Sequence, residues 1–195
     1  MHWISIRYEA SKLLSPQVEF QDFVDVFEDK VNGWYLNWAS EIGKDQHAGY
    51  AVLLIAFSYF EGITIFRNGK SNGSKNDFIE GVKRIFGEDF DNSGISHDAA
   101  ITFLYQEGRC GFYHSGFARK GIILEDGEPI LRIKAEDING GELIAVRIDR
   151  RKFLAKIIGD FRIYISTLRL KSDMLLCENF KKSWNEVHKV QMSSI

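Results

Sequence analysis

The 195-residue sequence contains little cysteine and little proline. Its two cysteines, Cys110 and Cys177, are too few for a disulfide framework or a cysteine-based zinc site. Its two prolines, Pro16 and Pro129, leave most of the chain free to form long uninterrupted helices. Fifteen phenylalanines supply material for an apolar interior, so the sequence predicts a packed, folded protein rather than a disordered one.

The sequence also shows no secretory signal and no long membrane-spanning run. Its first ten residues, MHWISIRYEA, lack a basic region followed by an apolar stretch. The longest apolar run, residues 51–66, is short for a membrane span and contains Glu61. We therefore expect a soluble, cytoplasmic protein without a membrane partner.

Neither sign of charge dominates the chain, whose formal net charge is −2. Residues 1–97 contain nine Lys or Arg against fourteen Asp or Glu, whereas residues 98–195 contain sixteen against thirteen. The chain as a whole is therefore not a basic nucleic-acid coat, but its second half permits contact with a polyanion such as RNA.

Apolar residues recur at helical spacing near the N-terminus. Ser15 and Pro16 form a good helix start, because a hydroxyl caps the helix and proline needs no partner for a missing N–H. The apolar pattern that follows is interrupted at Gly33 and resumes at Trp34 and Trp38. We expect one helical region there, with both tryptophans continuing the buried stripe.

Five further helices are predicted. The second covers residues 46–67 and is apolar on nearly all sides, so it should be central. The third covers 78–86, and the remaining three follow Ser96, Asp149 and Asp173 as capping residues.

Between the fourth and fifth helices the apolar pattern changes to the alternation that is typical of strands. The predicted strands are residues 120–125, 129–135 and 142–148. Asp126-Gly127 and Gly140-Gly141 have the composition of the turns between them. The three strands are therefore expected to form a small antiparallel meander.

These elements predict a mainly α protein, an up-and-down helical bundle with a small antiparallel β-meander inserted before the last two helices. We expect a single domain over 1–195. Its parts are a helical core at 15–117, the meander at 120–148 and two C-terminal helices at 149–192.

The stretch EGRCGFYHSG places Arg109 and His114 in an R-x4-H spacing near the end of the fourth helix. On an ideal helix these two residues lie about 140° apart, so they converge only if the helix loosens at Gly111. Glycine is costly inside a helix, so Gly108 and Gly111 indicate close backbone approach or local unwinding. The alternative is an ordinary helix C-terminus, with Arg109 solvated and His114 favoured by the helix dipole.

The chemistry of the two side chains suits cleavage of RNA through its own 2′-hydroxyl. His114 titrates near neutrality and can accept the hydroxyl proton, while Arg109 can bind two phosphate oxygens and stabilise charge on phosphorus. The leaving oxygen also needs an acid, and one chain offers no obvious second histidine nearby. A homodimer would supply His114 twice.

The segment YQEGRCGFYHSG, which ends a fourth helix after an apolar second helix, resembles the HEPN superfamily (higher eukaryotes and prokaryotes nucleotide-binding). The all-helical bundles of that superfamily carry an R-x4–6-H motif, and the helix order matches over residues 17–116. The resemblance implies a metal-independent endoribonuclease without a cofactor, often a toxin or antiviral effector, whose site forms between two copies. RNA, a second copy and an antitoxin protein are the partners it suggests.

Four further residues are candidates for the site. Glu61 either holds Arg109 through a bidentate contact or faces solvent at a seam of the bundle. Tyr113 either contacts RNA or packs at the helix end, and Arg119 and Lys120 are expected to contact RNA.

Alternatives to the nuclease remain open. Many active HEPN members have a polar residue after the arginine, where this chain has Cys110, so a non-catalytic RNA-binding or protein-interaction module would look similar. Cys110 also shares a helix face with His114, which suggests a thiol-dependent hydrolase as a third possibility. The basic run from Arg150 to Lys152 is either a solvated face or a contact for RNA backbone.

Overall fold

The computed structural model describes residues 4–13, 17–91, 95–135 and 143–188. This part of the chain is mainly helical and carries one small three-stranded sheet. In chain order the elements are η1 (Ala10–Leu13), α1 (Phe20–Val31), η2 (Asn32–Leu36), α2 (Asn37–Ile42), η3 (Gln46–Ala48), α3 (Gly49–Asn68), α4 (Lys75–Phe86), α5 (His97–Phe103), η4 (Leu104–Arg109), α6 (Cys110–Ser115), β1 (Ile122–Leu124), β2 (Leu131–Ala135), β3 (Leu143–Ile148), α7 (Arg150–Leu170) and α8 (Met174–His188). Segments η2 and η4 are π-helical, and η1 and η3 are short 3₁₀ helices.

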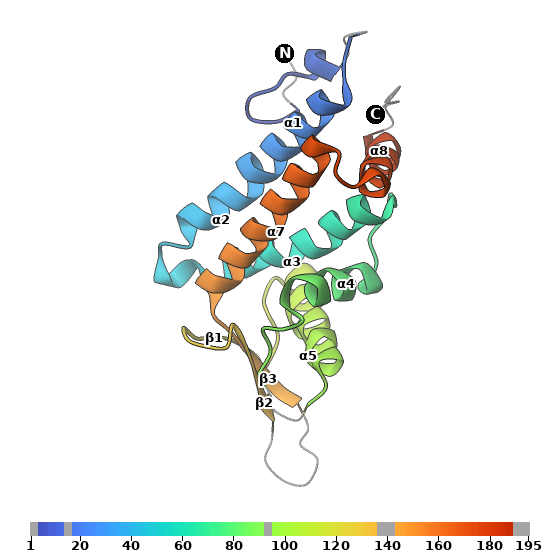
Figure 1. The fold of residues 1–195 in the computed structure, drawn as a ribbon. Helices are drawn as coiled ribbons and strands as arrows, with labels where there is room; N and C mark the ends of the chain where they lie inside the picture. The colour runs from blue at the N-terminus through green and yellow to red at the C-terminus, as the bar shows by residue number, and fades with distance from the viewer. Residues whose placement is uncertain (1–3, 14–16, 92–94, 136–142, 189–195) are drawn as a thin grey trace.

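Helix α3 lies at the centre of the fold, as its apolar character predicts. It packs against α2, α4, α7 and α8, while α1 and α2 run alongside α7 (Figure 1). Together with η3, it is the one helix of the described residues that is long and apolar enough to cross a membrane. Of its most apolar window, 56% is buried inside the fold, which is consistent with the core helix of a soluble protein.

The first helical region differs from the prediction in its start and in its buried face. Ser15 and Pro16 lie outside the described residues, and α1 begins only at Phe20. Trp34 and Trp38 are 41% and 58% exposed, so the expectation that they continue the core stripe is wrong. The reason is the π-helical segment η2, whose extra residue rotates the following turns and buries other positions.

Three of the other predicted helix starts are confirmed, whereas α4 begins at Lys75, three residues before the predicted start at residue 78. The hydroxyl of Ser96 accepts the N–H of Asp98, and Asp149 accepts the N–H groups of the first turn of α7. The carboxylate of Asp173 accepts the N–H of Leu176 at 3.0 Å at the start of α8. In each case a short polar side chain satisfies a backbone donor that has no partner within the helix.

The sheet is mixed and is not the antiparallel meander that the sequence predicts. Its order is β1-β3-β2, with β3 central, parallel to β1 and antiparallel to β2. The residues after β1 do not form a tight hairpin but pass around the end of β3. Asp149 holds them there, because its carboxylate accepts the N–H of Gly127 at 3.0 Å and its own N–H donates to Ile130. Gly140 and Gly141, expected to form the second turn, lie outside the described residues.

Candidate functional site

The predicted motif lies on a continuous helical stretch made of α5, η4 and α6. The loosened part is the π-helical segment η4, which ends at Arg109, and not Gly111, which lies in regular α-helix. Gly116, with a φ of 75°, ends the stretch in the left-handed conformation. The chain then folds back, and the N–H of Arg119 donates to the carbonyl of Glu107 at 2.7 Å.

The two motif glycines permit close packing, as the sequence predicts. A Cβ at Gly108 would lie 2.4 Å from Cε2 of Phe57, a fully buried ring on α3. A Cβ at Gly111 would lie 2.8 Å from the carbonyl oxygen of Phe117 and 2.9 Å from the nitrogen of Arg119. The helix therefore approaches α3 on one side and its own following loop on the other.

Arg109 and Glu61 form a two-point ion pair between η4 and α3. Nη2 of Arg109 donates to Oε2 of Glu61 at 2.9 Å, and Nε lies 2.7 Å from Oε1. The two side chains are 22% and 16% exposed, so water is largely but not fully excluded. Of the two possibilities for Glu61, the structure has the contact with Arg109.

Two aromatic rings flank the guanidinium group of Arg109. Its Cζ lies 4.4 Å from the ring centre of Tyr113 and 5.7 Å from that of Tyr105. Burial acts to lower the pKa of Arg109, but the hydrogen bond and charge of Glu61 outweigh it, so the pKa is raised. Arg109 is therefore permanently charged and fixed in direction.

His114 is not brought into contact with this pair. It lies exposed in the last turn of α6, and its ring makes no hydrogen bond, ion pair or ring contact within the described residues. The remaining predicted residues surround the motif on the surface. Tyr113 is 52% exposed and covers Arg109, whereas Arg119 and Lys120 are exposed in the loop that follows α6.

Two other sequence interpretations change with the structure. The thiol of Cys110 lies beside Tyr105, and burial, followed by the interaction with this thiol, raises the pKa of Tyr105. No pair with His114 exists in the described part of the chain. Arg150 is buried and donates to the carbonyl of Asp45 at 2.6 Å, so the basic run is not a uniformly solvated face.

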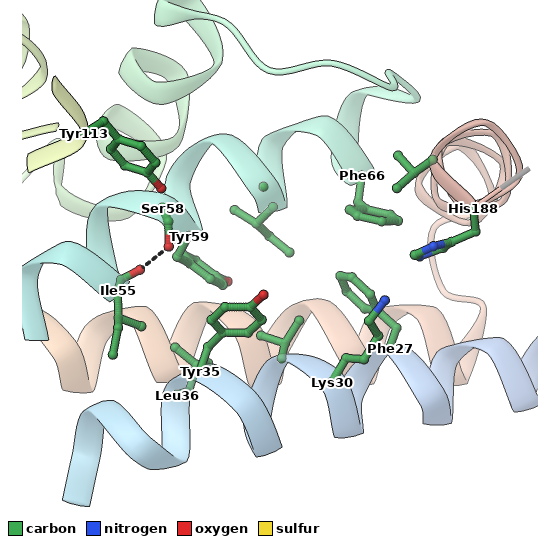
Figure 2. A pocket seen from close by; sticks show the side chains of 14 residues that line it. Phe27, Lys30, Tyr35, Leu36, Ile55, Ser58, Tyr59, Phe66, Tyr113 and His188 are labelled. Atoms are coloured by element: carbon green, nitrogen blue, oxygen red, sulfur yellow. Dashed lines mark hydrogen bonds between the residues drawn. The ribbon is translucent and has the colours of Figure 1, made fainter. Parts of the chain in front are cut away.

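A groove of about 400 Å³, which the sequence does not predict, runs along α3 (Figure 2). Ile55, Ser58 and Gly62 of α3 line one side, and residues of α1 and η2 line the other. Tyr113 stands at one end and His188 of α8 at the opposite end. The groove therefore adjoins the Arg109–Glu61 pair through Tyr113. The one sequence signal for it is a glycine within an otherwise apolar helix.

Among the described residues, no three His, Cys, Asp or Glu side chains are grouped so that they could hold a metal ion. Comparisons with protein-family models, curated proteins and solved structures found no match to this chain.

Proposed function

We propose that this chain is a dimeric, metal-independent endoribonuclease of the HEPN type. One observation carries the proposal: a surface guanidinium, Arg109, is oriented by Glu61 and covered by Tyr113, five residues before an exposed histidine. Tertiary contacts that fix an arginine at the surface are expected where an anion has to be bound in a defined direction.

In the proposed reaction each side chain has a separate task. His114 removes the proton from the 2′-hydroxyl, and the 2′-oxygen attacks phosphorus while the bond to O5′ breaks. The products are a 2′,3′-cyclic phosphate and a 5′-hydroxyl. Arg109 binds the phosphate, since its Nη1 has no hydrogen-bond partner in the described residues while Nε and Nη2 face Glu61. Glu61 is a positioning residue.

The dimer supplies the acid that one chain lacks. In a two-fold dimer the second His114 would protonate the leaving O5′. Apolar side chains beside the motif support such an interface, because Tyr50, Leu54 and Phe117 are 47%, 41% and 76% exposed. Tyr50 of α3 also contacts the ring of Phe112 of α6, so the two helices lie side by side on the face of the protein that carries the motif.

The test is cleavage of a generic RNA in the presence of EDTA by the full-length protein. We expect cyclic phosphate ends from the wild type and a loss of about 100-fold or more in His114→Ala and Arg109→Ala. His47→Ala is the matched control, because His47 is also an exposed histidine and its side chain contacts Gln46 and no residue of the motif. The nuclease proposal fails if the wild type does not cleave, or if His114→Ala cleaves as fast as His47→Ala.

The positioning role of Glu61 has its own readout. Glu61→Gln keeps the size of the side chain but removes the charge that orients Arg109, so kcat is expected to fall while KM changes little. Equal kcat values for Glu61→Gln and the wild type would contradict the role.

Phe117→Glu tests the dimer. A charge at this exposed position is expected to shift sedimentation toward the monomer, and the cleavage rate is expected to fall in proportion to the fraction of dimer that is lost. Full cleavage by a monomeric variant would contradict a composite site.

The second candidate is a non-catalytic RNA-binding or protein-interaction module. The observation that favours it is that Glu61 already neutralises Arg109 within one chain, and His114 there has no partner among the described residues. Retained RNA binding without cleavage by the wild type would support this candidate. If cleavage is found, growth arrest of cells that express this protein tests the toxin role. Relief of that arrest by co-expression of a protein encoded beside it tests the antitoxin role.

A further inference from the structure

The groove along α3 has an apolar floor whose polar groups are already occupied. The hydroxyl of Ser58 donates to the carbonyl of Ile55 at 2.7 Å (Figure 2). The hydroxyl of Tyr59 donates to Asp160 at 2.8 Å. Ile63 and Phe66 continue the floor towards α8. The floor formed by α3 thus offers carbon surface, which suits the apolar part of a ligand, while the hydroxyls of Tyr35 and Tyr113 lie on the other walls of the groove.

Gly62 keeps the middle of the groove open. It lies in the interior of α3, where glycine is less favourable than alanine, and a Cβ there would meet no atom within 4 Å. Close packing of protein therefore does not explain this glycine, in contrast to Gly108, whose Cβ would meet Phe57.

One end of the groove holds a cation without a counter-charge. Lys30 of α1 is half-buried, and no carboxylate of the described residues forms an ion pair with it. Its neighbours are the ring of Trp184, 5.9 Å from Nζ, and His188. Burial lowers the pKa of Lys30, and burial together with Lys30 lowers the pKa of His188 to about 4, so His188 is neutral at pH 7.

A half-buried ammonium group without a partner is unfavourable, and an anion at this position would relieve the cost. The volume of about 400 Å³ falls within the range of small-molecule sites. From Ile55 to Phe66 the floor extends about 16 Å along the axis of α3, which fits a chain rather than a compact ring.

We propose that this groove binds a small anionic amphiphile, with its aliphatic chain along α3 over Gly62 and its carboxylate beside Lys30 and His188. The proposal is independent of the nuclease, since it uses neither Arg109 nor His114. An RNA strand is less suited to the groove, because Lys30 is the single lysine or arginine of its lining, whereas an RNA backbone carries one negative charge at each phosphate.

The test is calorimetric titration of the full-length protein with three ligands of equal chain length, namely decanoate, decanol and decyltrimethylammonium. We expect saturable binding of one decanoate per chain, about tenfold weaker binding of the alcohol, and no binding of the cationic ligand. Bound decanoate should also raise the melting temperature.

Three variants locate the site. Lys30→Met should bind decanoate and decanol equally, because it removes the charge and keeps an apolar chain. Lys44→Met is the matched control, since Lys44 is 71% exposed and pairs with Glu41, and it should behave as the wild type. Gly62→Leu should abolish binding of both ligands, because its side chain fills the groove.

The proposal fails if the wild type binds all three ligands equally, or if Lys44→Met and Lys30→Met lose the same discrimination. It also fails if Gly62→Leu, shown to be folded by circular dichroism, still binds decanoate. Displacement of decanoate by a short RNA oligonucleotide would assign the groove to RNA instead. The absence of a titration signal with all three ligands would also overturn the proposal.

Discussion

Two glycine-to-alanine substitutions test whether packing, rather than helix propensity, decides where this chain uses glycine. Gly62 lies within α3 and Gly108 within η4, so alanine should favour the helical backbone at both positions. The structure gives the two positions different amounts of free space for a Cβ atom. A Cβ at Gly62 meets no atom within 4 Å, whereas a Cβ at Gly108 would lie 2.4 Å from Phe57.

The opposite outcomes follow from these distances. Gly62→Ala should raise the free energy of unfolding by about 0.5–1 kcal/mol, because it reduces the conformational freedom of the unfolded chain at no steric cost. For Gly108→Ala the same gain is offset by an overpacking cost of about 1–3 kcal/mol. The ring of Phe57 is fully buried among the rings of Phe78, Phe112 and Phe153, so it cannot move aside cheaply. We expect a net loss of about 1–2 kcal/mol.

Thermal and urea unfolding measure both variants. For a chain of this size, Gly62→Ala should raise the melting temperature by about 1–4 °C and Gly108→Ala should lower it by about 2–8 °C. Equal shifts of the same sign at the two positions would refute the argument, because they would mean that the approach of η4 to Phe57 has no energetic consequence.

Further predictions concern buried charge. Asp149→Ala should lower the free energy of unfolding by about 2–3 kcal/mol, because it removes the N-cap of α7 and leaves the N–H of Gly127, in the loop at the end of β3, without its acceptor. Asp149→Asn should lower it less. Asp160→Asn should cost about 2 kcal/mol, since Asp160 is the one carboxylate among the described residues that pairs with Arg67 and Arg84, at 3.3 and 3.4 Å. Equal urea midpoints for variant and wild type would contradict this. The pKa of His188 is lowered to about 4 from 6.5, so the folded state binds fewer protons between these values. Stability should therefore fall as pH drops from about 6.5 to 4, by at most about 3 kcal/mol, and a flat difference between wild type and His188→Phe over that range would refute the shift.

Local interactions explain what the sequence predicted correctly. The apolar character of residues 46–67 indicated a central helix, and the capping residues Ser96, Asp149 and Asp173 marked three helix starts. These features depend on nearest neighbours along the chain, namely the period of apolar residues and a side chain that reaches the next free N–H. The close approach at Gly108 was predictable for the same reason, since glycine inside a helix needs an explanation.

Tertiary structure decided the features that depend on segments distant in sequence. The insertion of a π-turn at η2 rotates Trp34 and Trp38 out of the core, and its local sign in the sequence is the interruption of the apolar pattern at Gly33. The strand order differs from the expected meander because the loop from β1 to β2 crosses the end of β3, where Asp149 accepts a hydrogen bond from it. The partner of Arg109 is 48 residues away on another helix, and the groove needs α1, α3, α6 and α8 together. The sequence by itself therefore determined the helices and named the charged residues of the candidate site. Only tertiary packing decided which of those residues are in contact, because the free energy of such a contact depends on side chains of other helices, which the residues next to it in the sequence do not indicate.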